Sequence, residues 1–247
     1  MERQYSGIQP WFMSLAKPGN TAIVCREPIG DNGGPFMQSR LGLSSSQVPR
    51  LYLASASPRR RELLAQIGLG HLLLPQHIDE SVRSGESPEL YVQRLARQKA
   101  EAGWRDGNRQ LNLPVLAADT TVVCDGKVLG KPATLQEAQV MLGLLSARSH
   151  QVLTGIAVQR GEQLQEKVVS TDVSFRKLTR DEIDAYWDSG EPHDKAGAYG
   201  IQGKAAVFVE SISGSYSNVV GLPLFETAIL LEHFGISVVS LLKGCST

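Results

Sequence analysis

Three consecutive arginines follow a short apolar segment and a run of small residues, in the sequence LYLASASPRRRELL of residues 51–64. Pro58 suits the first position of a helix and Ser57 suits its N-cap. Because a helix N-terminus carries partial positive charge, cations are unfavourable there unless an anion lies among them. Phosphate is the anion that free backbone N–H groups and arginines both bind well. This junction therefore favours a phosphate site over its alternative, a solvated basic turn.

A single carboxylate interrupts an apolar segment at Asp119, between residues 115–118 and 121–123. Burial of an unpaired carboxylate is strongly unfavourable, so Asp119 needs a partner. A general base and a ligand of a divalent metal are both chemically reasonable roles. The alternative is a structural aspartate whose oxygens accept hydrogen bonds from backbone amides or an arginine.

Two lysines are candidate anion-binding residues by their positions. Lys99 falls on the apolar stripe of the helix expected from Ser87, although a lysine there usually extends its ammonium outward to water. Lys131 precedes Pro132, which restricts it to an extended backbone. Lys131 also comes directly after the hairpin that follows Asp119, so its ammonium can point back toward the ends of those strands.

The segment DKAGAYGIQG, residues 194–203, has glycines three residues apart. This spacing permits close approach of the backbone to a ligand, and it is equally typical of a series of tight turns. Gln202 carries both a donor and an acceptor, so it can read the edge of a nucleobase.

The composition limits the classes of protein. The chain has 247 residues, 42% of them hydrophobic, with 25 basic and 25 acidic residues. The hydrophobic content suffices for one core. Because the charges balance, the chain has no net electrostatic field that would attract nucleic acid or a membrane surface. No apolar run approaches the roughly 18–20 residues of a membrane span. The widely separated cysteines favour a reducing cytoplasm over disulfides or a zinc site; they are Cys25, Cys124 and Cys245.

We expect three parts along the chain. Residues 1–48 are rich in glycine and proline without lasting apolar periodicity, which predicts a flexible extension. A genuine tail and a misassigned start, with Met37 as an internal alternative, both remain open. Residues 49–240 form the folded domain, and residues 241–247 form a C-terminal tail.

Strands and helices alternate through the folded part, which predicts a single α/β domain with a mixed sheet. The expected strands are 114–118 continuing through 121–123, 150–158, 166–176 and 205–210. Capping boxes at Thr134–Glu137 and Thr179–Glu182 begin two of the helices. The last helix is expected from Pro223 to about Gly235.

Seven segments, taken together and in this order, resemble the Maf family of nucleoside triphosphate pyrophosphatases. They are SASPRR (55–60), LARQKA (95–100), ADT (118–120), GKP (130–132), HQVLT (150–154), DKAGAYGIQG (194–203) and NVVGLP (218–223). The resemblance covers residues 51 to 236. It implies a long twisted mixed sheet flanked by helices, with a deep cleft between two lobes.

The implied activity is the metal-dependent hydrolysis of a nucleoside triphosphate to the monophosphate and pyrophosphate. Asp119 matches the family's proposed proton acceptor. Arg59, Thr120 and Gln202 stand where the subgroups of the family differ. Their combination resembles the subgroup that hydrolyses dTTP and UTP, and 7-methyl-GTP specificity is the alternative.

The resemblance gives roles to the remaining candidates. Phosphate binding is assigned to four of them, Ser55, Arg60, Lys99 and Lys131. The candidate ligands for the metal, expected to be Mg²⁺ or Mn²⁺, are Asp119, Asp79 and Glu80, although an exposed acidic turn explains the last two equally well. In this arrangement the arginines form one wall of a triphosphate site and Asp119 lies opposite.

The expected protein is a cytoplasmic enzyme with a nucleotide substrate, without nucleic-acid or membrane partners, and a homodimer is one of its expected forms. The family is also associated with septum formation, the arrest of cell division and the removal of non-standard nucleotides. A nucleotide-binding regulator of septum formation with little catalysis is therefore the second hypothesis.

Overall fold

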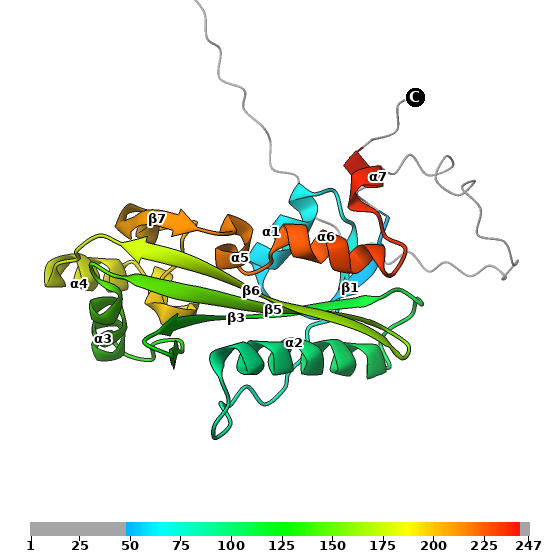
Figure 1. Ribbon diagram of the computed structural model, residues 1–247, viewed down its shortest axis with the longest axis horizontal. Coiled ribbons are helices and arrows are strands. Elements are labelled where there is room, and N and C mark those ends of the chain that lie inside the picture. The colour runs from blue at the N-terminus through cyan, green and yellow to red at the C-terminus, as the bar shows by residue number, and fades with distance from the viewer. Residues whose placement is uncertain (1–47, 243–247) are drawn as a thin grey trace, which may run out of the picture. The chain divides into compact units, whose positions relative to one another are not determined.

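One mixed sheet organises the residues that the computed structural model describes, 48–242, with side chains described to residue 240. Its strand order is β2-β1-β3-β5-β6-β7, and β4 pairs with β3 (Figure 1). The strands are β1 Leu51–Leu53, β2 His71–Leu73, β3 Val115–Cys124, β4 Lys127–Leu129, β5 Ser149–Arg160, β6 Gln163–Phe175 and β7 Val209–Ser213. β1 is parallel to β2 and β3, and the other pairs are antiparallel, which confirms the predicted α/β class.

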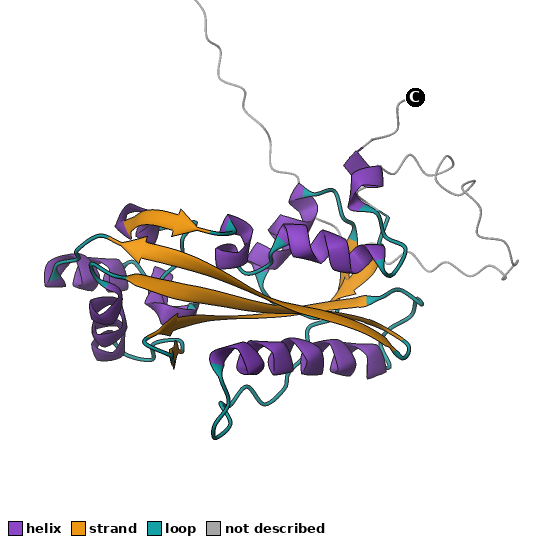
Figure 2. Cartoon of the chain, in the orientation of Figure 1, coloured by secondary structure: helices purple, strands orange, loops and turns teal. Residues whose placement is uncertain are grey.

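Helices cover both faces of the sheet (Figure 2). They are α1 Pro58–Gln66, α2 Pro88–Arg105, α3 Leu135–Leu145, α4 Arg180–Asp188, α5 Tyr216–Val220, α6 Leu224–Glu232 and α7 Val238–Leu242, with the 3-10 helices η3 Glu191–Asp194, η4 Ala196–Ala198 and η5 Lys204–Phe208. In Figure 1, α2 lies along one face, and α1, α5 and α6 lie on the other. No helix in the described part of the chain is long and apolar enough to cross a membrane.

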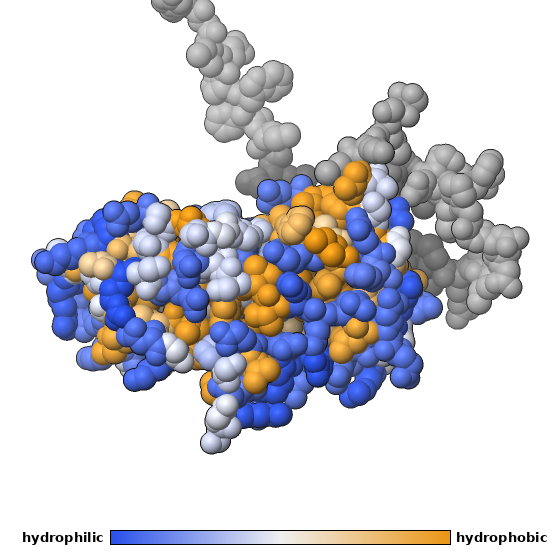
Figure 3. Space-filling model, viewed as in Figure 1, coloured by the Kyte–Doolittle hydropathy of each residue, from blue (hydrophilic) through white to orange (hydrophobic). Residues whose placement is uncertain are grey.

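Alternation along the strands divides the core between the two faces. Leu51 and Leu53 of β1 belong to the larger core, with residues of α1 and α6, whereas Tyr52 belongs to a smaller core with Ala96 and Ala100 of α2. This is the arrangement expected when successive side chains of a strand point to opposite faces. The outer side of α6 stays apolar, with Phe225 72% exposed, and Figure 3 shows apolar surface among the polar residues of that face.

The absence of a side chain at Gly155 lets α2 pack closely on the sheet. A Cβ on Gly155 would overlap the backbone carbonyl of Val92 in α2. Gly155 of β5 lies opposite Asp119 of β3 in the antiparallel register. This close contact therefore brings α2 against the sheet at the pair of Gly155 and Asp119.

Several predicted details are confirmed. The hairpin expected after Asp119 is present between β3 and β4, and its two-residue turn is formed by Asp125 and Gly126, both at positive φ. The capping box of Thr179 and Glu182 is complete. The capping box of Thr134 is only half-formed. The Thr134 side chain accepts from the N–H of Glu137, but the Glu137 carboxylate accepts from the N–H of Ala133 instead of that of Thr134.

Two predicted elements are wrong in part. The strand expected at 205–210 is the 3-10 helix η5 followed by β7, so the strand begins only at Val209. The last helix expected to reach Gly235 ends at Glu232, and α7 follows it. The predicted extension falls almost entirely outside the described residues, so the three-part division of the chain stays a prediction.

Candidate active site

A cleft opens at an unpaired stretch of one edge of β3. β1 pairs with β3 only at Val115 and Leu116, and β4 pairs only with residues 122–124. Between these two pairings, the edge of β3 at 117–121 has no strand partner in the described structure. The cleft there has a volume of about 1080 Å³. An unpaired edge explains how Asp119 and Thr120, whose side chains point to opposite faces of a strand, both line it.

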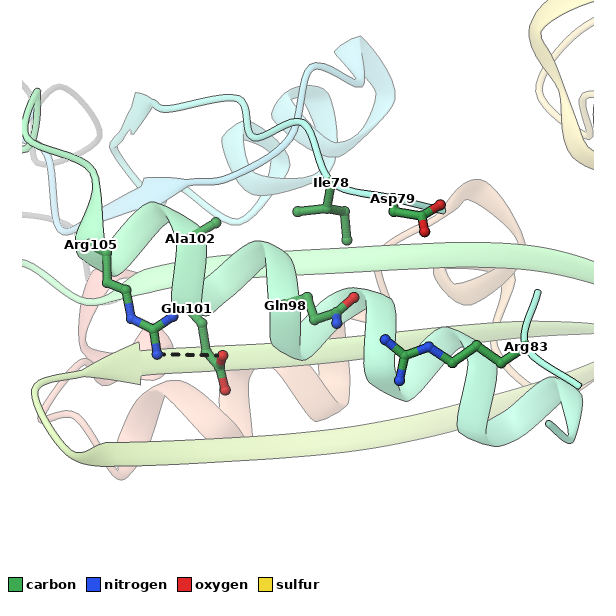
Figure 4. Close-up of a pocket in the computed structure, with 7 residues that line it drawn as sticks. All are labelled: Ile78, Asp79, Arg83, Gln98, Glu101, Ala102 and Arg105. Atoms are coloured by element: carbon green, nitrogen blue, oxygen red, sulfur yellow. Dashed lines mark ion pairs between the residues drawn. The ribbon is translucent and has the colours of Figure 1, made fainter. Parts of the chain in front are cut away.

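The cleft gathers nine of the ten residues singled out from the sequence. These are Ser55, Arg59, Arg60, Glu80, Lys99, Asp119, Thr120, Lys131 and Gln202. Asp79 is the exception. It lines a separate open pocket of about 350 Å³ alongside α2, with Gln98, Glu101 and Arg105 (Figure 4). Its carboxylate accepts a hydrogen bond from the N–H of Ser81 at 2.9 Å, so the structure does not bring Asp79 into the cleft.

Lys99 lies between two carboxylates. Its Nζ is 2.7 Å from Asp119 Oδ1 and 2.5 Å from Glu80 Oε1. Only 9% of the Lys99 side chain and 13% of the Asp119 side chain are exposed, against 50% for Glu80. The ammonium is therefore directed inward, and not outward to water. Burial raises the pKa of Glu80, but the hydrogen bond and charge of Lys99 outweigh it and leave that pKa below its ordinary value.

The loop that carries Glu80 is tied to the first turns of α2. Tyr91 donates its hydroxyl to the carbonyl of Glu80 at 2.9 Å. Arg94 donates to the carbonyl of Ser81 at 2.9 Å and holds both carboxylate oxygens of Glu86, at 2.6 and 2.7 Å. Burial raises the pKa of Tyr91 to about 12, so its hydroxyl remains a donor near neutral pH. The sequence provides no local signal for Tyr91, whose partner is eleven residues away.

Arg60 joins three elements around the cleft. Its Nε donates to the carbonyl of Gly221 at 2.8 Å, Nη1 to Ser55 Oγ at 2.9 Å, and Nη2 to Thr120 Oγ1 at 3.1 Å. Burial lowers the pKa of Arg60 from its ordinary value, although a guanidinium stays protonated in proteins. Two of its five N–H groups remain available in this network to a ligand. Ser57 occupies the N-cap position of α1, but its side chain does not cap the helix.

The expected placement of the arginines on one wall of the cleft, with Asp119 opposite, stays a prediction, and the structure shows where Arg60 is anchored. α1 follows β1, which is the parallel neighbour of β3, so Arg60 reaches Thr120, the residue next to Asp119. The positive charge of Arg60 and the carboxylate of Asp119 therefore lie on adjacent elements. A ligand that contacts Arg60 is also within reach of the Lys99–Asp119 pair.

Residues 191–203, together with the end of the β3–β4 hairpin at Gly130 and Lys131, form another wall of the cleft. The carbonyl of Gly130, next to Lys131, accepts from the N–H of Gly197 at 2.9 Å. Arg59 Nη1 lies 4.0 Å from Asp194 Oδ2. Gln202 is exposed to the cleft. Glu191 also lines the cleft but has no local sequence signal, because its partners Tyr186 and Lys204 lie five and thirteen residues away.

Carboxylates at two positions fit a divalent metal only in part. No group of three or more histidine, cysteine, aspartate or glutamate side chains that could hold a metal occurs among residues the structure describes. Glu80 and Asp119 both contact Lys99, which places two carboxylates around one cation. Mg²⁺ is commonly bound by one or two carboxylates together with phosphates of the substrate. The donor set therefore suits a metal that arrives with a nucleotide.

Comparison with known proteins decides the family. The chain matches the Maf-like protein family over residues 50–234. It belongs to this family. The "dTTP/UTP pyrophosphatase" of Chromobacterium violaceum is 55% identical over 193 residues, covering 77% of this chain and 98% of the relative.

Further relatives carry the same description. The "dTTP/UTP pyrophosphatase" of Bordetella parapertussis is 55% identical over 200 residues, covering 78% of this Maf family chain and 97% of the relative. The "dTTP/UTP pyrophosphatase" of Nitrosomonas europaea is 54% identical over 198 residues, covering 76% of this chain and 96% of the relative. Among solved structures, a HAM1 protein from Coxiella burnetii is 21% identical and covers 75% of this chain and 100% of its own, at a TM-score of 0.39, a similarity too weak to bear on the fold.

Proposed function

We propose that this Maf family protein is a nucleoside triphosphate pyrophosphatase that hydrolyses dTTP and UTP to the monophosphate and pyrophosphate. The observation that carries the proposal is the buried Lys99–Asp119 pair beside Arg60, in a cleft of about 1080 Å³. The names of the relatives support the substrates. Arg59, Thr120 and Gln202, the expected determinants of that substrate choice, line the same cleft.

The phosphates bind to the basic side of the cleft. Arg60 donates its two remaining N–H groups, and Lys131 adds a positive charge from the hairpin end. Lys99 supplies a third positive charge, since its ammonium has three N–H groups and only two carboxylate partners. Ser55 orients Arg60 through its hydroxyl. These groups stabilise negative charge as it moves to the departing pyrophosphate.

Asp119 acts as the general base. It takes a proton from a water molecule, whose oxygen forms a bond to the α-phosphorus. The bond between that phosphorus and the bridging oxygen to the β-phosphorus breaks, and pyrophosphate leaves with the electron pair. Lys99 orients Asp119 for this proton transfer through their 2.7 Å contact.

Glu80 and Asp119 would hold a divalent metal, Mg²⁺ or Mn²⁺, together with the phosphates. When bound, such a metal supplies Lewis-acid stabilisation of the charged phosphate oxygens. Asp79 has no part in this set because it lies in the separate pocket.

A nucleotide panel tests the function. We expect purified protein to release pyrophosphate from dTTP and UTP, with Mg²⁺ or Mn²⁺ present, faster than from other nucleotides. Asp119→Asn should lower kcat by about 10²–10⁴-fold, the range of general base catalysis, while the fold is retained. Nucleotide binding without pyrophosphate release under any metal would contradict the enzyme assignment. Unchanged turnover in Asp119→Asn would contradict only its assigned role.

The cellular setting belongs to the same proposal. We place the protein in the cytoplasm, where the buried free thiol of Cys124 stays reduced. Its partner is the nucleotide substrate, and a homodimer is its proposed assembly. Cell fractionation tests the location, and light scattering on the purified protein measures the mass of the assembly.

A further inference from the structure

The loop that carries Gln202 rests on the end of α4 and on η3. Tyr186 of α4 donates its hydroxyl to Glu191 Oε1 at 2.8 Å. The same hydroxyl accepts from the N–H of Gly200 at 3.2 Å. Glu191 Oε2 accepts from the N–H of Lys204 at 2.9 Å. One carboxylate and one hydroxyl therefore hold the backbone on both sides of Gln202.

The glycine spacing of this segment has a steric cause. A Cβ on Gly203 would overlap the Glu191 carboxylate, and a Cβ on Gly200 would overlap the Lys195 side chain. Neither glycine has a positive φ, so space is the requirement and not backbone conformation. The glycines permit the loop to lie directly on Glu191.

Charge keeps Glu191 in place as an acceptor. Burial raises the pKa of Glu191, but the backbone N–H of Lys204, the Tyr186 hydroxyl and the charge of Lys195 bring it below its ordinary value. Burial and the bond to Glu191 raise the pKa of Tyr186, so this hydroxyl remains protonated. Lys195 also donates to the backbone carbonyl of Glu191 at 2.6 Å, which fixes η3 itself.

The 3-10 helix η3 also lies beside Arg59, the second of the residues expected to determine base selection. Asp194, the last residue of η3, lies 4.0 Å from Arg59 and accepts from Lys195 at 2.6 Å. Glu191 begins η3 and holds the loop of Gln202. A single short turn thus connects Arg59 and Gln202, which come from distant parts of the chain.

We propose that Glu191 and Tyr186 are positioning residues for base selectivity, which set the place of Gln202 without contacting the reacting phosphates. This inference rests on the proposed function for its substrates. The ligand feature that they govern is the edge of the pyrimidine ring that distinguishes dTTP and UTP from CTP. In CTP an amino donor replaces the exocyclic oxygen acceptor of dTTP and UTP, and an acceptor nitrogen replaces their neighbouring ring N–H donor.

Glu191→Gln and Tyr186→Phe test the positioning. A glutamine at 191 has one acceptor oxygen in place of two, so it cannot hold both Tyr186 and Lys204 as the carboxylate does. A phenylalanine at 186 keeps the ring packing and removes only the hydroxyl. In both variants we expect amide hydrogen exchange of residues 200–204 to accelerate about tenfold or more, since Tyr186→Phe removes the acceptor of the Gly200 N–H and Glu191→Gln weakens that of the Lys204 N–H. Unchanged exchange in both variants overturns the inference, whatever the enzyme's activity.

Selectivity is the second measurement. We expect each variant to raise KM for dTTP and UTP about tenfold, leave kcat within about twofold, and lower the preference for dTTP over CTP about tenfold, the effect of a misplaced hydrogen bond. An equal loss on every nucleotide would show a merely structural role. Gln202→Ala should lower the same preference, and adding Glu191→Gln to it should change the preference no further.

Matched controls are Glu210→Gln on β7 and Tyr216→Phe on α5. Glu210 and Tyr216 are exposed and do not line the cleft. Both controls should leave exchange and selectivity as in the wild type. A wild-type protein that shows no pyrophosphate release refutes the proposed function, whereas an active enzyme with unchanged selectivity in Glu191→Gln and Tyr186→Phe refutes this inference alone.

Discussion

At the scale of single residues, the position of Lys99 separates two interpretations that the sequence left open. A lysine on the apolar stripe of a helix usually reaches water with its ammonium. Here the ammonium meets Asp119 and Glu80, and only 9% of the side chain is exposed. The partners come from a strand and from a loop, so no helical pattern could have revealed them.

Lys99→Met should inactivate the enzyme while keeping most of the buried volume. Its loss leaves Asp119 and Glu80 without their shared cation, and removes the contact that lowers the pKa of Glu80. We expect kcat/KM to fall at least about 100-fold, by the loss of one strong electrostatic contact in the transition state. The control is Lys127→Met on β4, an exposed lysine outside the cleft, and equal activity in the two variants would contradict the role of Lys99.

At the scale of elements, the distance between α2 and the sheet determines whether Lys99 reaches Asp119. Gly155 controls that distance because α2 passes directly over it. The loop ahead of α2 then brings Glu80 to the same point through Tyr91 and Arg94. Helix, loop and strand therefore act together in placing three charges.

Gly155→Ala should lower both stability and activity. The new methyl group meets the Val92 carbonyl, which is backbone and cannot rotate away. We expect a loss of about 1–3 kcal/mol in the free energy of unfolding, the usual effect of overpacking, and a lower kcat as Lys99 moves from Asp119. Denaturant unfolding and pyrophosphate release measure the two effects.

Gly143→Ala is the matched control for that substitution. Gly143 lies in α3, and a Cβ there meets no atom within 4 Å. It should stabilise the protein by about 0.5–1 kcal/mol, because alanine is the better helix former. A similar destabilisation by both substitutions would exclude the α2 contact as the cause.

The loop of Glu80 predicts a pH dependence of stability. The bidentate bond from Arg94 holds the pKa of Glu86 at about 2, below its unfolded value of 4.5. Its contribution to stability is therefore complete above pH 4.5 and is lost as the pH falls toward 2. Glu86→Gln should be less stable than the wild type at pH 6, and the difference should fall below about half by pH 3. Denaturant unfolding at each pH measures the stability difference between Glu86→Gln and the wild type. A difference that does not change with pH would contradict this role of Glu86.

At the scale of the whole molecule, sequence reasoning succeeded where signals are local. The turn at Asp125 and Gly126, and the capping box at Thr179, each depend on residues within four positions. It failed where distant partners decide. The 3-10 turns of 191–208 form around the Glu191 carboxylate, which accepts from the N–H of Lys204 thirteen residues away.

The division of the chain gives a prediction at this scale. The Maf family match covers residues 50–234, and the relatives align over almost their whole length with about three quarters of this chain. A chain shortened to residues 47–247 should therefore fold and keep its activity within about twofold, with Tm within about 2 °C of the full chain. Thermal unfolding and pyrophosphate release check this, and loss of either would assign the first 46 residues to the functional unit.

The cleft joins two kinds of backbone. Asp119 and Lys99 lie within a long strand and a long helix, whereas Arg59 and Gln202 meet at the short turns of 191–203. If Arg59 and Gln202 select the base as we propose, substitutions in those turns alter the nucleotide that is accepted without disturbing the pairing of the sheet. Such a protein is suited to acquire new substrates after gene duplication, because its recognition surface can diverge while its hydrolytic machinery is inherited intact.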